Sequence, residues 1–245
     1  MNFKEIKTRI EKPFIVDHHL EIRLLVIFLI INGLVLVNAV IHDPRIGYDA
    51  LDHLEYIKAF SDFQLVTPEQ SREFFSPPLP YALPALVLGF TGLKIFWIGK
   101  IAQLLNFFLS LGVTYFLIKL CREIFRKKSL PFHTLLFLGV LPVYYKTFSQ
   151  VRGETYLVFF ALLSVYYLLK MVIHRDYTVR TLVLLGMSMS LCALSRQWGI
   201  FLFPGIFLLL AVHWIRFPRR RKQISLSMIF VLLIVLIFSG WFYAS

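Results

Sequence analysis

A polar loop behind the first long apolar segment holds most of the residues that could carry out chemistry. Seven of the fourteen acidic residues lie in this loop, residues 43–73. Four polar side chains, Asp49, Asp52, His53 and Tyr56, recur there at helical spacing, so a short helix would present them as one stripe. Carboxylates and an imidazole beside a membrane can act as general bases or hold a divalent cation. The alternative is a solvated helix face whose charges only keep the loop in water.

The same helix would have an apolar side. Its members are Ala50, Leu51, Leu54 and Ile57. This division predicts an amphipathic helix next to the membrane, with its acids toward a water-filled cleft and its leucines toward lipid or neighbouring helices. We expect Asp49 to be the principal carboxylate, assisted by Asp52, His53 and Tyr56.

Two later clusters combine an arginine with other polar groups. Residues 152–154 read Arg-Gly-Glu, and residues 196–198 read Arg-Gln-Trp. A guanidinium binds phosphate oxygens in pairs, so Arg152 and Arg196 are candidate phosphate ligands, and Glu154 is a candidate second carboxylate. The alternative is structural: the arginines would anchor the chain at the membrane interface, and Glu154 would stabilise a helix N-terminus.

Composition indicates a helical membrane protein. Of 245 residues, 58% are hydrophobic and 16% are charged, whereas a soluble domain carries about 25% charged residues. The mean hydropathy is +0.72. A helix needs about 20 residues to cross a bilayer, and seven apolar segments approach that length. These segments are Leu24–Ile41, Ile101–Leu120, His133–Ser149, Tyr156–Ile173, Thr181–Leu194, Gly199–Trp214 and Ile224–Ala244. The predicted fold is therefore all-α, a transmembrane bundle of about seven spans.

Basic residues set the expected orientation. The net charge is +12, but Lys and Arg gather in short segments that alternate with the spans, which indicates anionic lipids as partners and argues against nucleic acid. If the Pro- and Gly-containing segment 79–97 does not cross, 18 of the 26 basic residues face the cytoplasm; if it crosses, only 10 do. We therefore expect an interfacial or re-entrant segment. The chain then divides into a cytoplasmic part with a retained signal anchor, 1–23, and one module, 24–245, with an outer loop at 42–100. Lys146 would anchor the outer interface.

The order of these features resembles that of a known superfamily. Asp49-x-x-x-His53-x-x-Tyr56 is followed by Ser-Pro-Pro-Leu-Pro-Tyr at 76–81, and Arg152-x-Glu154 lies beyond the next two spans. The chain is similar to the multi-spanning glycosyltransferases of the GT-C superfamily, and within it to the protein O-mannosyltransferase and aminoarabinose-transferase-like branch. In that branch an acidic residue of the first outer loop precedes a His/Gln/Tyr-Pro-Pro-Leu segment, whereas a serine stands before the prolines here. The resemblance covers the chain as the N-terminal seven-span module of such enzymes, so we expect a fragment, a truncated paralogue or half of a split enzyme.

This resemblance implies a hexosyl- or pentosyltransferase that uses a polyprenyl-phosphate-sugar donor. The acceptor would be a hydroxyl of a glycan, lipid or protein at the outer or luminal face of a bacterial or archaeal cell membrane or the endoplasmic reticulum. Asp49 would act as base or hold Mg²⁺ or Mn²⁺, with Glu154 as the second acid, and Arg152 or Arg196 would neutralise the leaving phosphate. Direct displacement would invert the anomeric carbon. The alternative is a non-catalytic membrane scaffold or a degenerate subunit that keeps the fold.

Overall fold

The computed structural model describes residues 18–244 apart from residues 48, 63, 65 and 126. Most of the predicted cytoplasmic segment, and with it the predicted signal anchor's N-terminal flank, lies outside the described residues. The described part of the chain is helical and contains no strand. This confirms the all-α class that the long apolar segments predict.

Within the described residues, five helices are long and apolar enough to cross a membrane, by length and composition. They are α2 (His18–Ile41), α5 (Ile95–Leu120) with the π-helical turn η1 (Cys121–Phe125), α8 (Glu154–Ile173), α10 (Leu202–Arg216) preceded by the 3-10 turn η2 (Gln197–Phe201), and α11 (Arg221–Ala244) preceded by η3 (Pro218–Arg220). Each lies where an apolar segment predicts a span. The helix predicted to begin at Ile101 starts at Ile95 instead.

Two of the seven predicted spans fall short of a spanning helix. The predicted span His133–Ser149 is divided into α6 (Leu130–Gly139) and α7 (Pro142–Ser149). Proline has no backbone N–H and clashes with the preceding turn, so Pro142 begins a new helix instead of continuing the old one. The other short helix is α9 (Val179–Ala193), which ends at the predicted turn before Arg196. Seven spans are therefore not established by helix length.

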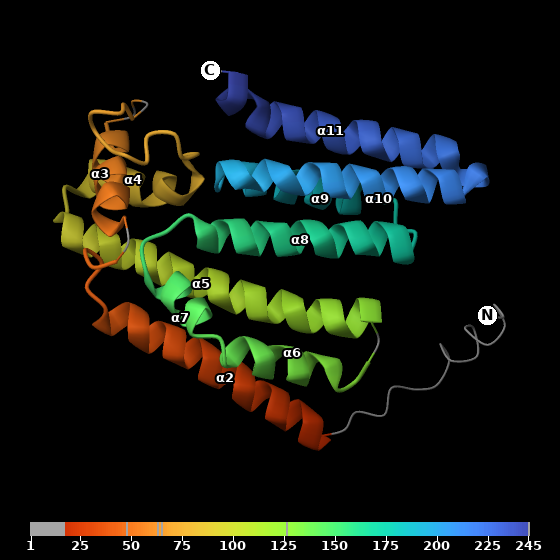
Figure 1. Cartoon of the computed structure of the whole chain (residues 1–245), viewed down its shortest axis with the longest axis horizontal. Helices are drawn as coiled ribbons and strands as arrows, with labels where there is room; N and C mark the ends of the chain where they lie inside the picture. Colours follow the sequence, from red (N-terminus) through yellow and green to blue (C-terminus); the bar gives the residue numbers. More distant parts are fainter. Residues whose placement is uncertain (1–17, 48, 63, 65, 126, 245) are drawn as a thin grey trace.

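The helices lie side by side and form two packed groups (Figure 1). One group joins α2, α5, α6 and α7 through buried side chains that include Ile31, Val113, Leu135 and Phe148. The other joins α8, α9, α10 and α11 around a second buried cluster. Two further helices, α3 (Ala50–Phe60) and α4 (Leu79–Thr91), gather at one end of the bundle. Their core continues into the first turns of α5.

A stripe of polar side chains along α5 ties the first group of helices together. Ser110 donates to Asn32 Oδ1 at 2.8 Å, and Asn32 donates to Thr114 Oγ1 at 3.0 Å. Nearer the end that carries α3, Gln103 donates to the carbonyl of Ser149 at 2.8 Å. Because lipid is as apolar as the packed side chains, such interhelical hydrogen bonds specify which helix faces which. The stripe thereby holds α2, and the end of α7, against α5.

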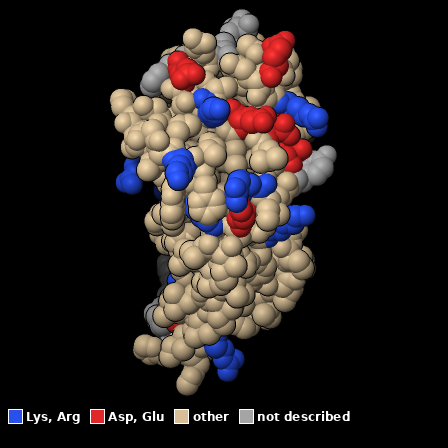
Figure 2. All heavy atoms as spheres, turned by 90° about the vertical axis from the view of Figure 1, so that its left-hand side faces the viewer, with Lys and Arg blue, Asp and Glu red and all other residues tan. Residues whose placement is uncertain are grey.

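The two ends of the bundle differ in character. The segments 122–125, 127–128, 175–180 and 216–222 are basic and lie at the end opposite α3 (Figure 1). Figure 2 looks onto the end that carries α3 and shows acidic and basic groups gathered there, while much of the flank is uncharged. The apolar segment 79–97 remains at this end as α4 and the start of α5. A polar site is therefore confined to one end of an apolar bundle.

Candidate active site at one end of the bundle

The predicted amphipathic helix of the first loop is α3, and Asp49 stands at its N-cap position. Asp49 has a left-handed backbone, with φ 55° and ψ 15°, and its side chain makes no capping hydrogen bond. A residue other than glycine pays an energetic penalty for this conformation, although Asp and Asn pay less than most. Asp49 is half-buried. The structure therefore leaves its carboxylate available, because the carboxylate does not serve the helix as a cap.

The two faces of α3 differ from those expected from the sequence. His53 and Tyr56 are buried together with Leu54 and Ile57, whereas Leu51 is 60% exposed. The buried arc is wider than an isolated amphipathic helix requires, because α3 packs against both α4 and the start of α5. The prediction that His53 and Tyr56 lie on a polar face opposite Leu54 and Ile57 is therefore wrong.

His53 and Tyr56 instead belong to an aromatic and polar cluster with Tyr81 of α4. The rings of Tyr56 and Tyr81 stack with their centroids 4.1 Å apart. His53 Nδ1 and the Tyr81 hydroxyl share a hydrogen bond of 2.8 Å, and the Tyr56 hydroxyl donates to the carbonyl of Ser76 at 3.0 Å. These contacts place α3 against the Pro-rich segment that begins α4.

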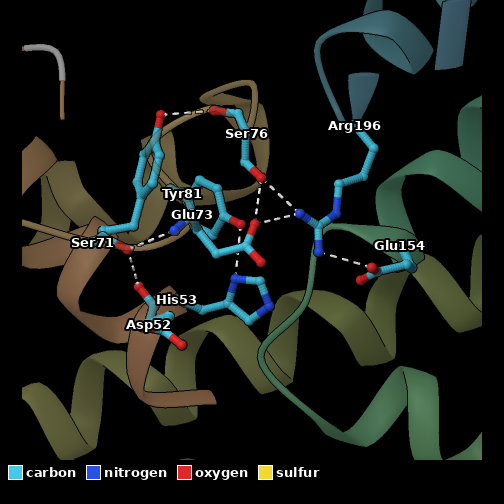
Figure 3. Close-up of polar contacts among 9 residues, drawn as sticks. Asp52, His53, Ser71, Glu73, Ser76, Tyr81, Glu154 and Arg196 are labelled. Atoms are coloured by element: carbon cyan, nitrogen blue, oxygen red, sulfur yellow. Dashed lines mark hydrogen bonds and ion pairs between the residues drawn. The ribbon is translucent and has the colours of Figure 1, made fainter. Parts of the chain in front are cut away.

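Arg196 joins three distant segments at the centre of the site (Figure 3). Its Nη1 donates to Glu73 Oε2 and, at 2.6 Å, to the hydroxyl oxygen of Ser76, which in turn donates to Glu73. Its Nη2 donates to Glu154 Oε1 at 2.8 Å. The side chains of Arg196 and Glu73 are each 9% exposed, whereas that of Glu154 is 38% exposed. We call Glu73, Ser76, Glu154 and Arg196 the carboxylate bridge.

Close backbone packing brings these segments together. The backbone N–H of Leu79 donates to the carbonyl of Leu194 at 3.2 Å. A Cβ atom at Gly153 would lie 3.0 Å from the carbonyl oxygen of Ser195 and 3.2 Å from Cγ of Pro80. The three chain segments that carry the bridge can approach this closely only because residue 153 lacks a side chain. The start of α8, the start of α4 and the turn after α9 thus meet at one point.

The charges of the bridge shift the pKa values of its neighbours. Burial raises the pKa of Glu73, but the hydrogen bond from Ser76 and the charge and hydrogen bond of Arg196 outweigh burial and hold the pKa below its usual range. Burial lowers the pKa of His53, more strongly than the negative charge of Glu73 raises it. The site at neutral pH therefore contains an ionised Glu73 and an uncharged His53.

Several polar atoms around the bridge are buried without a hydrogen-bond partner among the described residues. They include Glu154 Oε2, Arg196 Nε and Gln197 Oε1. Buried polar groups are nearly always paired, so a cluster of unsatisfied ones points to a missing polar ligand or water. Arg152, two residues before Glu154 in the chain, is half-buried, and its guanidinium forms no ion pair within the described part of the chain. The atoms that lack partners include both acceptors and a donor, which suits a ligand rich in hydroxyl groups.

The predicted residues have different positions in this site. Glu154 and Arg196 lie in the bridge itself, and Asp49 lies one helical turn before His53. Asp52 is half-buried, and its main-chain carbonyl accepts a hydrogen bond from Ser71 at 2.8 Å. Sequence reasoning missed three central residues: Glu73, Ser76 and Tyr81. Their signal was their place on either side of the Pro-Pro-Leu-Pro segment 77–80: Glu73 ends the acidic loop, Ser76 directly precedes the segment, and Tyr81 directly follows it.

The residues present do not fit a metal centre built on Asp49 and Glu154. No group of three or more His, Cys, Asp or Glu side chains converges within the described residues. Glu154 Oε1 is held by Arg196, whose positive charge opposes a divalent cation at the same carboxylate. The predicted Mg²⁺ or Mn²⁺ at Glu154 is therefore left out of the reaction proposed below.

The fold and the site define a multi-pass membrane protein with a polar centre at one end of its helices. Residues 76–241 match the family described as dolichyl-phosphate-mannose-protein mannosyltransferase, and because this match covers more than half of the chain, the protein belongs to that family. It is thus a membrane glycosyltransferase by family, in agreement with the predicted GT-C relationship. No curated protein and no solved structure matches the chain significantly. The matched segment contains Arg152, Glu154 and Arg196 and begins after Asp49 and Glu73.

Proposed function

We propose that the protein transfers a sugar from a polyprenyl-phosphate-linked donor to an acceptor hydroxyl, with inversion at the anomeric carbon. The observation that carries this proposal is the buried, unsatisfied Glu154 Oε2 beside Arg152, in a member of a glycosyltransferase family. A carboxylate oxygen without a partner accepts a hydrogen bond from a sugar or acceptor hydroxyl, and a neighbouring guanidinium binds phosphate. The turn at residues 152–154 therefore carries both a carboxylate that can bind a hydroxyl and a guanidinium that can bind the donor phosphate.

Asp49 is the proposed general base. Its carboxylate is half-exposed and does not cap α3, and its left-handed backbone is the kind of local strain that functional sites retain. Gly47, two residues earlier, lies against Gln150, since a Cβ there would be 3.1 Å from the Gln150 carboxamide. The segments that carry Asp49 and Arg152 thus touch, which supports a role for both residues on one substrate.

The two arginines take different roles in this proposal. Arg152 binds the donor phosphate, because its guanidinium is not already held by a carboxylate of the described residues. Arg196 faces two carboxylates and has both terminal nitrogens engaged, so it positions Glu154 and supplies its positive charge to the leaving phosphate at longer range. His53 and Tyr56 hold α3 in place and do not touch substrate.

The reaction is a single displacement. The acceptor oxygen attacks the anomeric carbon as the bond from that carbon to the phosphate oxygen breaks. The proton of the acceptor hydroxyl passes to Asp49, and the electron pair of the broken bond stays on the polyprenyl phosphate beside Arg152. A positioned general base contributes about 10²- to 10⁴-fold to such a rate.

We further propose the membrane arrangement of a seven-span module. In it the pair α6 and α7 and the short helix α9 each complete one crossing, α4 stays at the interface, and the site faces the outer or luminal side. The support is the separation of charge: the basic loops lie together at the end away from α3, as cytoplasmic loops should. Within the GT-C superfamily, we assign this module to the protein O-mannosyltransferase and aminoarabinose-transferase-like branch.

Transfer by membranes enriched in this protein tests the proposed function. A radiolabelled polyprenyl-phosphate mannose is the donor, and label incorporated into protein, glycan and lipid acceptors is measured separately. Asp49→Asn should lower incorporation about 100-fold. Asp62→Asn, an exposed acid of the same loop, is the matched control and should leave it unchanged. Absence of transfer by the parent to every acceptor class would favour the non-catalytic scaffold.

A further inference from the structure

A second polar pocket lies at the same end of the bundle and shares no residue with the carboxylate bridge. It has a volume of about 340 Å³ and lies between the end of α2 and helix α7. Asn38 and Lys146 line it, as do Ser149 and Gln150. The protein's proposed reaction makes no use of this pocket.

The pocket contains a positive charge without a counter-charge. Lys146 is exposed, no acidic residue lines the pocket, and Lys146 forms no ion pair within the described part of the chain. The other basic side chain, His42, already uses its Nε2 in a 2.7 Å hydrogen bond with the carbonyl of Ile46. Lys146 is thus the group available to an anion.

A hydrogen-bond acceptor is also left unused there. Gln150 is 6% exposed, yet its Oε1 is buried and has no partner among the residues described. Because a buried amide oxygen is costly when unsatisfied, Gln150 Oε1 calls for a hydroxyl or another donor from a ligand or water. A second polar group, Asn38, is exposed on α2 between Val37, which is 50% exposed, and Val40, which is 66% exposed. An amide on an apolar, lipid-facing surface also favours a polar occupant in the pocket.

The rim of the pocket is apolar. Ile41, which is 77% exposed, and the exposed Pro142 form its edge, on helices that belong to the lipid-facing part of the bundle. A ligand with a polar head in the pocket could therefore extend a hydrocarbon tail along α2. A polar pocket with an apolar rim suits a lipid better than it suits a free nucleotide or a sugar phosphate, because these two ligands have no hydrocarbon tail.

We propose that this pocket binds the headgroup of an anionic phospholipid with headgroup hydroxyls, of which phosphatidylglycerol is the simplest example. Lys146 contacts the phosphate, Gln150 Oε1 accepts a hydrogen bond from a glycerol hydroxyl, and the acyl chains lie along Ile41. A zwitterionic lipid fits less well, because its ammonium group would lie near Lys146. The site would tie α2 to α7 at the break that Pro142 introduces.

Native mass spectrometry of the full chain, with defined lipids added to the detergent-solubilised protein, tests the site. Three lipids distinguish the contribution of the charge from that of the hydroxyls. Phosphatidylglycerol has both, phosphatidylmethanol keeps the charge but has no headgroup hydroxyl, and phosphatidylcholine is zwitterionic. We expect one tightly held phosphatidylglycerol per chain, bound about tenfold more strongly than phosphatidylcholine. Lys146→Gln should weaken both anionic lipids about fivefold, which is the effect of one lysine at a membrane surface. Gln150→Leu should weaken phosphatidylglycerol alone and leave phosphatidylmethanol unchanged.

The matched control is Lys94→Gln, which removes another exposed lysine at this end of the bundle, outside the pocket. It should leave the bound phosphatidylglycerol in place. Equal losses in Lys146→Gln and Lys94→Gln, or equal binding of the three lipids, would overturn the proposal. Displacement of phosphatidylglycerol by an equimolar polyprenyl phosphate would also overturn it, and would assign the pocket to the donor. The transfer assay described above is independent of these outcomes.

Discussion

Arg196 binds two carboxylates that lie 123 and 42 residues away in the sequence, Glu73 and Glu154. The first belongs to the loop after α2, and the second begins α8. A single guanidinium therefore fixes the position of the acidic loop relative to the helix that supplies the proposed second acid. Its role as a bridge explains why one side chain can matter both to the stability of the fold and to the geometry of the site.

Removal of Arg196 should destabilise the protein strongly. Arg196→Gln leaves Glu73 buried without its ionic partner, which costs about 3 kcal/mol. The free energy of unfolding in detergent, measured with a chemical denaturant, reports this loss. The double variant Arg196→Gln/Glu73→Gln should recover part of it, because no charge is then buried alone. Arg45→Gln breaks an exposed pair with Asp43 and should cost much less, because water screens that pair. A loss in Arg196→Gln no larger than that control would refute the bridge.

A methyl group at residue 153 should disturb the meeting point of three segments. Gly153→Ala places a Cβ 3.0 Å from the Ser195 carbonyl oxygen, and Arg196 must then shift. We expect a fall of about 1–3 kcal/mol in stability, as in other overpacked sites, and a parallel loss of transfer activity. Gly33→Ala, on α2, is the control, since its added Cβ would meet no atom within 4 Å. Unchanged activity and stability in Gly153→Ala would show that the backbones are not in contact there.

Stability should fall as the pH is lowered from neutral, through His53. Its folded pKa lies below the ordinary value of 6.5, so below pH 6.5 the unfolded chain binds a proton that the folded chain does not. The stability that comes from the neutral His53 ring is thus lost as the pH falls. This loss comes before Glu73 takes up a proton, because the pKa of Glu73 lies below 4.5. Thermal unfolding between pH 7.5 and pH 5 measures the slope. His53→Asn should flatten this slope, and a slope as steep as that of the parent would contradict the prediction.

Arg152 should be sensitive to replacement by lysine. Lysine keeps the charge but loses the paired geometry of the guanidinium, so Arg152→Lys should weaken donor-lipid binding about tenfold. An arginine that only anchors the interface tolerates lysine, which reaches the polar region equally well. Binding of a polyprenyl-phosphate sugar to the purified protein is the measurement, with Arg72→Lys, an exposed arginine of the first loop, as the control. Parent-like binding by Arg152→Lys would place the phosphate site elsewhere.

The proposed orientation can be read from single cysteines in intact cells. Ser129→Cys lies at the basic end, before α6, and should be protected from a membrane-impermeant thiol reagent. Asp62→Cys, exposed after α3, should react. The native thiols Cys121 and Cys192 are buried and provide a low background. Labelling of Ser129→Cys from outside the cell would reverse the topology.

The sequence by itself determined the helical class and much of the local structure. Apolar runs predicted each long helix, the prolines before Leu79 placed the start of α4, and the polar spacing after Asp49 predicted α3. These features depend on the hydropathy and backbone chemistry of one short stretch, so a sequence window contains them. Pro142, which begins α7 and so divides the predicted span His133–Ser149, acts through the same local backbone chemistry.

Only the tertiary structure decided which polar groups meet. The pairing of Arg196 with Glu73 depends on how α9, α4 and α8 are placed, and the burial of His53 and Tyr56 depends on the neighbours of α3 on two sides. The polar stripe of α5 contributes to that placement through partners such as Asn32, 78 residues from Ser110. An ion pair or a buried hydrogen bond forms only where a donor and an acceptor lie within about 3 Å of each other in space. Residue types and their spacing along one segment do not say which distant segment will come that close.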